Sequence, residues 1–183
     1  MPSVGRYAAP PPAAVPAPPQ DSSAELLFSI ARLLATTSDP AAATRLISEE
    51  GARLLPFTDL TVALKLTAGE RVVLLKPGEK RALANLPLVP VTGTSLGRVL
   101  RGEAPNSFAR ARGESRLIVP LRVAGKVHGS LVFSARPPAE LKEAHVGPAQ
   151  RLADIVAAHF ELLRRSAMLQ PPSAPGWRRA QAG

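Results

Sequence analysis

The most constraining feature of the sequence is a run of alternating apolar residues over residues 114–134. Its apolar side chains fall at every second position on both sides of Gly125. Successive side chains of a strand point to opposite faces of a sheet, so this period of two predicts two half-buried strands. Segment 124–126 contains the glycine that a tight turn needs, which makes the run an antiparallel hairpin. One face of this hairpin would carry Leu117, Val119, Leu121, Val123, Val127, Gly129, Leu131 and Phe133.

Two helices are predicted before the first strand. Asp21 or Ser22 would cap the first helix, whose apolar stripe ends near Thr37. Asp39 followed by Pro40 is typical of the start of a second helix, because proline is favoured at the first helical position. The buried side of the second helix would consist of Ala43, Leu46, Ile47 and Leu54.

The middle of the chain predicts a second hairpin and a crossover. Apolar residues alternate over residues 59–66, and a second strand follows at residues 71–75. Residues 79–93 contain two prolines and predict an irregular crossover. A short helix would begin near Ser95 and end at Gly102, a residue type that commonly terminates helices.

The last predicted helix runs from about His145 to Met168. Its apolar residues recur at alternating spacings of three and four, which is the a/d seam of a coiled coil. A second apolar row lies beside the seam, so this helix is expected to meet either the first helix of the same chain or a second copy. Packing within one chain and a homodimer are both open at this point. The dimer interface would use Val146, Ala149, Ala153, Val156, Phe160 and Leu163.

Together these elements predict a single α+β domain over residues 21–168. Five to six antiparallel strands would form its sheet, with the N- and C-terminal helices packed on one face. The Pro/Ala-rich residues 1–20 cannot bury a core, and the basic residues 169–183 contain three prolines. Both segments are therefore expected to be disordered tails.

Composition narrows the classes of function. The 183 residues contain no cysteine, which excludes disulfides, thiolate metal sites and thiol chemistry. No nucleophile elbow, Gly-rich phosphate loop or histidine–carboxylate cluster is present, so we expect a non-enzymatic protein without cofactor or metal. Neither a secretion signal nor an apolar stretch long enough to span a bilayer is visible, which predicts a soluble cytoplasmic protein.

Several segments resemble the GAF domain family, the small-molecule sensor module of bacterial signalling proteins. Residues 91–100 look like the family's helix after the crossover, and residues 115–121 and 125–131 are similar to its last two strands. The final helix matches at residues 152–157, and the resemblance covers about residues 24–166. It implies an antiparallel sheet with the terminal helices on one face and a ligand pocket on the other, beneath the crossover.

Differences from the family limit what this resemblance implies. Members that attach bilins, and those that reduce free methionine sulfoxide, use cysteines that this chain lacks. The cyclic-nucleotide signature is incomplete, since Asn106 and Phe108 match it but its lysine and its Asp-Glu pair are missing. Haem is ligated by histidine in some members, which keeps His128 as a minor haem option. A lone histidine without supporting partners is more often an ordinary polar residue.

The charge pattern points to an anionic ligand. The chain has a net charge of +9, and residues 98–126 contain seven Lys or Arg against two Glu. In a GAF layout this segment forms the rim and floor of the pocket, where arginine forks suit carboxylate or phosphate. A solvated basic surface is the alternative, since most charged residues are exposed. The candidate ligand-binding residues are Arg98, Arg116 and Arg122, with Ser95 at the start of the short helix and with His128 and Ser130, which would point to the open face.

The sequence therefore predicts a sensory or regulatory domain that binds a small ligand or a signalling partner in trans. A homodimer through the terminal helices is expected, without contact to a membrane. The alternatives are a dimerisation module without a ligand and a nucleic-acid-associated protein. Positive charge favours nucleic acid, but the strands are poor in aromatic residues for stacking and no helix-turn-helix pattern emerges. Binding to nucleic acid is therefore disfavoured.

Overall fold

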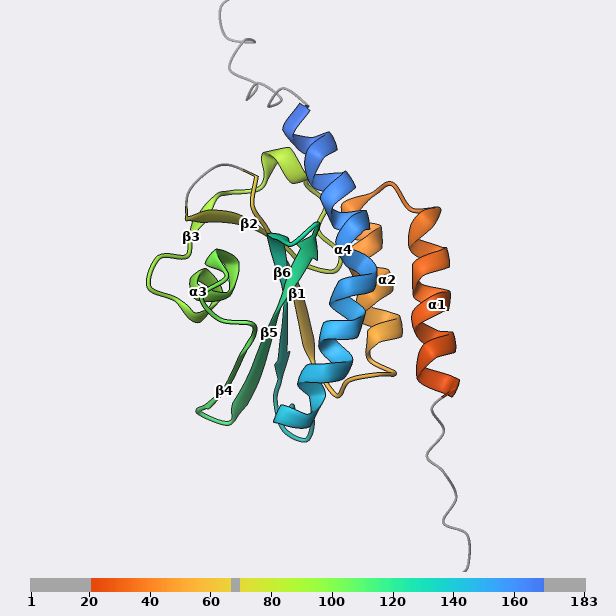
Figure 1. The fold of residues 1–183 in the computed structure, drawn as a ribbon, viewed down its shortest axis with the longest axis vertical. Helices are drawn as coiled ribbons and strands as arrows, with labels where there is room; N and C mark the ends of the chain where they lie inside the picture. Colours follow the sequence, from red (N-terminus) through yellow and green to blue (C-terminus); the bar gives the residue numbers. More distant parts are fainter. Residues whose placement is uncertain (1–20, 67–69, 170–183) are drawn as a thin grey trace, which may run out of the picture.

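One six-stranded antiparallel sheet organises the fold (Figure 1). The computed structural model describes residues 21–66 and 70–169. In this part of the chain all neighbouring strands pair antiparallel, in the order β3-β2-β1-β6-β5-β4. The predicted α+β class is confirmed. The strands are β1 (Asp59–Leu64), β2 (Arg71–Leu75), β3 (Val89–Pro90), β4 (Ser107–Ala111), β5 (Glu114–Val123) and β6 (Lys126–Ala135).

The predicted central hairpin consists of β5 and β6. Ala124 and Gly125 join the two strands with φ angles of 48° and 76°. Positive φ at both positions is the geometry of a two-residue type I′ turn, whose twist matches that of the flanking strands. The hairpin and its turn are therefore confirmed.

The pairing of β5 with β6 is interrupted once, next to the turn. Leu121 pairs with Gly129, whereas Arg122 pairs with Val127, so the register shifts by one residue on β6. Such a bulge changes which side chains share a face. Val127 packs with the cluster of Ala63, Val72, Val91 and Leu100 and not with the core that holds Leu131. The prediction that Val127 shares a face with Leu131 is therefore wrong.

Three helices cover one face of the sheet (Figure 1). α4 (Val146–Leu169) packs against β5 and β6, α2 (Pro40–Gly51) packs against β1 and β2, and α1 (Asp21–Ala35) packs on α2 and α4. α2 begins at the predicted cap, because the Asp39 carboxylate accepts hydrogen bonds from two amides of the first turn, at 3.2 and 3.0 Å. The helices at the two ends of the domain therefore pack together, as predicted.

An aliphatic core fills the space between these helices and the sheet. Its largest fully buried side chains include Phe133 of β6 and Phe160 of α4, together with several leucines and isoleucines. Phe57 packs on Phe133 with ring centroids 5.1 Å apart. Each fully buried side chain of this size stabilises the fold by about 2 kcal/mol, so this layer holds the domain together.

The predicted coiled-coil seam of α4 lies inside this core. Five of its six residues are buried within the single chain. The sixth, Val146, is partly buried and packs against the core. These side chains contact β5 and the neighbouring helices, so the seam has no free surface for a second copy. The buried seam residues are Ala149, Ala153, Val156, Phe160 and Leu163.

The opposite face of the sheet carries α3 (Ser95–Arg101), which packs on β4, β5 and β6. The crossover contains the short helix η1 (Leu83–Asn85), and a second short turn, η2 (Glu143–His145), precedes α4. The predicted tails, residues 1–20 and 169–183, lie outside the described residues except for Leu169, which ends α4. Because α3 is only seven residues long, it leaves part of this face uncovered.

Candidate functional site

The open face of the sheet carries a cleft beside α3. Two hollows of about 190 and 680 Å³ share Leu96, Arg116 and Val132 in their walls. We call the two hollows together the sheet-face cleft. Its walls combine apolar side chains and hydroxyl groups with the charged side chains of Asp59, Lys76, Glu114, Arg116 and Arg136.

A threonine cap and a glycine hold α3 close to the crossover. Thr94 Oγ1 accepts a hydrogen bond from the Gly97 amide at 3.0 Å and donates one to the Val91 carbonyl at 2.7 Å. A Cβ atom at position 97 would overlap the same carbonyl oxygen, so this approach requires glycine. The cap therefore places Ser95 and Leu96 at the wall of the sheet-face cleft.

Arg116 is the central charged group of this cleft. Its side chain is 55% exposed and donates to the Glu114 carboxylate at 3.1 Å, while Arg136 donates to the same carboxylate at 3.4 Å. The hydrogen bond from Arg116 lowers the pKa of Glu114, with smaller contributions from Ser134 and Arg136. A ligand carboxylate or phosphate at Arg116 would therefore compete with an ionised Glu114.

A separate hollow lies at the turn of the central hairpin, away from the sheet-face cleft. It is an open groove of about 1020 Å³ between the ends of β1, α3 and α4 and the β5–β6 turn, and we call it the hairpin-end groove. Four segments that are distant in sequence bring their basic side chains to it. These are Lys65, Arg101, Arg122, Lys126 and Arg164.

A buried carboxylate anchors one wall of this groove. Glu161 is 5% exposed and accepts hydrogen bonds from Arg164 at 2.6 and 3.0 Å and from Arg165 at 2.6 Å. These hydrogen bonds, led by those of Arg164, lower the pKa of Glu161 to about 2. Arg164 also donates to the Lys65 carbonyl at 3.0 Å, which ties the end of α4 to the end of β1.

His128 belongs to the same network. Its Nδ1 lies 3.3 Å from Glu161, which is on α4. Burial lowers the pKa of His128, and the nearby Glu161 charge opposes this effect only in part. The prediction that His128 points away from the terminal helices is therefore wrong. His128 is the extra residue of the bulge, which breaks the alternation of faces along β6.

The six candidate ligand-binding residues do not converge on one site. Ser95 and Arg116 line the sheet-face cleft, whereas Arg122 and His128 line the hairpin-end groove. Arg116 and Arg122 are six residues apart on β5, which separates them by about 20 Å at a strand rise of about 3.3 Å per residue. Arg98 is exposed on α3 and lines neither hollow.

Ser130 is buried beneath α3 and does not reach either hollow. It pairs with Ala63 and Pro120 in the centre of the sheet, and its side chain is fully inaccessible. Its hydroxyl has no hydrogen-bond partner among residues 21–66 and 70–169. The side chain points to the open face as predicted, but α3 covers it.

Sequence analysis missed Lys65, Glu161 and Arg164. A signal for the latter two was present, because Glu161 precedes Arg164 and Arg165 at helical spacings of three and four residues. Lys65 carried no comparable signal, since it merely continues the polar positions of β1. Only the tertiary structure brings it beside α3 and α4.

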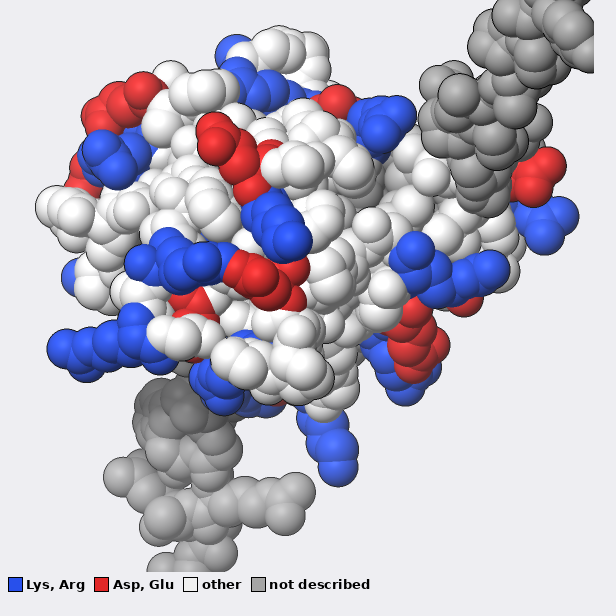
Figure 2. Space-filling view, turned by 90° about the horizontal axis from the view of Figure 1, so that it is seen from below, with Lys and Arg blue, Asp and Glu red and all other residues white. Residues whose placement is uncertain are grey.

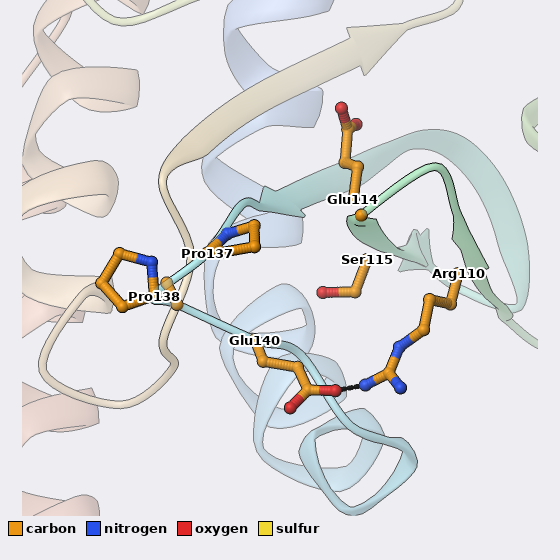
Figure 3. Close-up of a pocket in the computed structure, with 8 residues that line it drawn as sticks. Arg110, Glu114, Ser115, Pro137, Pro138 and Glu140 are labelled. Carbon is orange, nitrogen blue, oxygen red and sulfur yellow. Dashed lines mark ion pairs between the residues drawn. The ribbon is translucent and has the colours of Figure 1, made fainter.

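A further hollow, of about 300 Å³, lies at the end of the sheet opposite the hairpin-end groove. It is situated between the β4–β5 turn and the segment after β6 (Figure 3). Arg110 forms an ion pair with Glu140 across it. Ser115 Oγ accepts a hydrogen bond from the Leu141 amide at 2.8 Å and is thereby satisfied. Acidic and basic side chains are interspersed on this side of the molecule (Figure 2).

In residues 21–66 and 70–169, the acidic residues and histidines form no group of three or more that could hold a metal ion. The helices of these ranges include none that combines the length and the apolar character needed to cross a bilayer.

Comparisons with known proteins find structural but not sequence relatives. No protein-family model and no curated protein matches the sequence. Among solved structures, the GAF domain of the phosphoenolpyruvate-protein phosphotransferase from Acinetobacter is 14% identical, with a TM-score of 0.61, over 84% of this chain and 99% of that one. Residues 122 to 287 of a methyl-accepting chemotaxis protein are 14% identical, with a TM-score of 0.58, over 75% of this chain and 98% of that one.

An enzyme also shares this architecture. The free methionine-R-sulfoxide reductase from Neisseria meningitidis, solved with its substrate, is 19% identical, with a TM-score of 0.59, over 80% of this chain and 95% of that one. Identities this low establish the architecture and not the activity. The antiparallel sheet, with α1, α2 and α4 on one face and α3 on the other, gives this chain the fold of the GAF domain family.

Proposed function

We propose that this chain is a sensory or regulatory GAF-type domain that binds a small ligand in the sheet-face cleft. The observation that carries the proposal is the cleft itself, which lies on the face that the helices leave open and has Arg116 at its centre. The chemotaxis protein among the structural neighbours supports a role in signalling. Binding would be read out by a signalling partner.

The walls of the cleft favour a small ligand with one anionic group. Ile118, Val132 and Leu96 supply apolar contacts, and Ser95 supplies a hydroxyl. Arg116 can form a two-pronged contact with a carboxylate or phosphate once Glu114 is displaced. Because Glu114 competes for Arg116, we expect the affinity to rise when that carboxylate is removed.

Calorimetric titration with a library of anionic metabolites tests this proposal. A ligand of the cleft should bind the Arg116→Gln variant at least tenfold more weakly and the Glu114→Gln variant more tightly. Arg98→Gln is the matched control, because it removes an exposed arginine of α3 that lines neither hollow. Equal losses for Arg116→Gln and Arg98→Gln would show that only net charge matters and would refute the site.

We infer that the domain is not an enzyme. The absence of cysteine from the entire sequence supports this, because thiolate chemistry is then unavailable to the chain. Incubation of the purified protein with free methionine sulfoxide and a thiol reductant should give no methionine above the protein-free control. Turnover in that assay would contradict the inference.

We further propose a homodimer through the outer surfaces of α1 and α4. Their seam is buried, but Phe28 of α1 is 72% exposed and Leu162 of α4 is 66% exposed. The double variant Phe28→Lys, Leu162→Lys should sediment as a monomer at concentrations where the wild type is dimeric. Leu88→Lys, at an exposed leucine of the crossover, should leave the dimer intact. A monomeric wild type at high micromolar concentration would refute the proposal.

A further inference from the structure

We propose that the hairpin-end groove binds an organic polyphosphate, a ligand that joins a chain of phosphate groups to an apolar body. No described residue lines both this groove and the sheet-face cleft. The proposal is therefore independent of the function proposed for the cleft.

The groove contains cations that no carboxylate neutralises. Lys65, Arg122 and Lys126 form no ion pair with any acidic residue in ranges 21–66 and 70–169. They come from the end of β1 and from both sides of the hairpin turn. Like charges that gather in a concave surface raise the local potential and attract an anion of matching charge. Three positive charges match a chain of phosphates better than a single carboxylate.

The other two basic residues of the groove are already paired with carboxylates, which hold their side chains in place. Arg164 is held by Glu161, and Arg101 is held by Glu103 at 2.5 and 3.0 Å and by Glu70 at 2.6 Å. Lys65 is also positioned, because its ammonium group donates to the Leu100 carbonyl at 3.4 Å. A ligand would therefore meet cations that are partly organised in advance, which reduces the entropy lost on binding.

Size and lining indicate the chemical class of the ligand. A groove of about 1020 Å³ is far larger than one phosphate and falls at the upper end of ordinary ligand sites. Leu66, Val127 and Met168 add apolar surface next to the cations. Lysine ammonium groups bind phosphate as point charges, and the arginine fork matches phosphate oxygens as well. These features favour phosphates joined to an apolar or aromatic group.

Calorimetric titration of the full chain tests the proposal with three probes in 150 mM salt without divalent cations. ATP should bind saturably and several-fold more tightly than inorganic tripolyphosphate, which lacks the apolar body, and orthophosphate should not saturate. Equal affinities for ATP and tripolyphosphate would overturn the apolar part of the proposal. Absence of saturable binding by both would overturn the site.

Two triple variants separate a built site from net charge. The first triple variant removes the three unpaired cations of the groove and should weaken ATP binding at least tenfold. It combines Lys65→Gln, Arg122→Gln and Lys126→Gln. The second triple variant removes the same charge from the opposite end of the sheet and should weaken ATP binding less than twofold. It combines Arg110→Gln, Arg112→Gln and Arg136→Gln. Equal losses would overturn the proposal. Thermal unfolding of both variants checks that each remains folded.

Amide chemical shifts locate the bound ligand. ATP should perturb Gly102, Gly125 and Val127 of the groove and leave Ser95 and Leu96 of the sheet-face cleft unchanged. Perturbation of the cleft residues alone would place ATP in the other hollow and overturn the assignment.

Discussion

At the end of the sheet nearest the β4–β5 turn, arginines and carboxylates alternate. Arg110 pairs with Glu140 (Figure 3), and Arg116 and Arg136 share Glu114. At the end nearest the hairpin turn, the acids Glu103 and Glu161 are each committed to arginines beside them. Three further cations there have no carboxylate partner in the described part of the chain.

The difference shows that net charge and local charge carry different information. The net charge of +9 is the sum over the whole sequence and does not say where charges are paired. At one end of the sheet arginines are paired with carboxylates, whereas three unpaired cations share a concave groove at the other end. Buried and exposed carboxylates also differ in their structural importance, since Glu161 is 5% exposed whereas Glu114 is 26% exposed.

The largest expected effect is that of Glu161→Gln at the hairpin end. Removing one partner of a buried ion pair leaves Arg164 uncompensated, which should lower the free energy of unfolding by about 3 kcal/mol. Glu114→Gln is the matched change at the opposite end and should produce only a small fraction of that loss, because its arginines are solvated. Urea unfolding measures both. Similar losses for the two variants would contradict the distinction between the ends.

The second effect is destabilisation by mild acid. Burial lowers the pKa of both His128 and His159 below the ordinary value of 6.5. Unfolding then takes up protons, so their contribution to stability is complete above pH 6.5 and is lost as the pH falls below it. Near His128, the charges of Arg164, Arg165 and Lys65 also oppose protonation, whereas Glu161 favours it.

Urea midpoints between pH 7.5 and 5.5 measure this dependence. Glu161, whose pKa is lowered to about 2 by its arginine partners, stays ionised throughout this window. The midpoint should fall with pH in the wild type, and His159→Leu should reduce the slope, because the buried Nε2 of His159 has no partner among the described residues. An unchanged slope in that variant would show that His159 does not contribute.

Much of the fold could be predicted because local periodicity determines it. The alternation of apolar residues in β5 and β6 fixes which face is buried, and the Asp39-Pro40 start fixes the beginning of α2. The bulge could not be predicted, because Val127 continues the same alternation and only the pairing with Arg122 shows the shift. The seam of α4 was ambiguous for a similar reason. An apolar stripe packs equally well on a sheet or on another helix.

The candidate site was less predictable, because it depends on which segments meet. Ser95 and Arg116 were identified and do share a cleft, since the crossover returns α3 over β5. The groove brings together Lys65 and Arg164, which are 99 positions apart in the sequence. Arg164 donates a hydrogen bond to the Lys65 carbonyl, and no local sequence pattern encodes that contact. Ion pairs between distant residues, such as Arg101 with Glu70 and Arg110 with Glu140, are likewise decided by tertiary structure.

A smaller effect is expected from Arg110→Gln at the paired end. The Arg110 side chain, which forms an ion pair with Glu140, is 59% exposed. Loss of this pair should therefore change the free energy of unfolding by about 0.5 kcal/mol or less. The change should shrink further in 500 mM salt, because exposed charges are screened. A loss that persists in high salt would indicate that the pair acts through packing and not through charge.

The smallest effect, and the one with the opposite sign, is expected from Lys126→Glu at the hairpin end. Lys126 is exposed in the first position of β6, pairs with Val123, and lines the groove with Lys65 and Arg122. A carboxylate there would relieve repulsion between like charges and raise the free energy of unfolding by about 0.3 kcal/mol in 20 mM salt. The gain should disappear in 500 mM salt. A destabilisation as large as that of Arg110→Gln would mean that Lys126 already has an acidic partner, and the two ends of the sheet would then not differ in the way the ion pairs indicate.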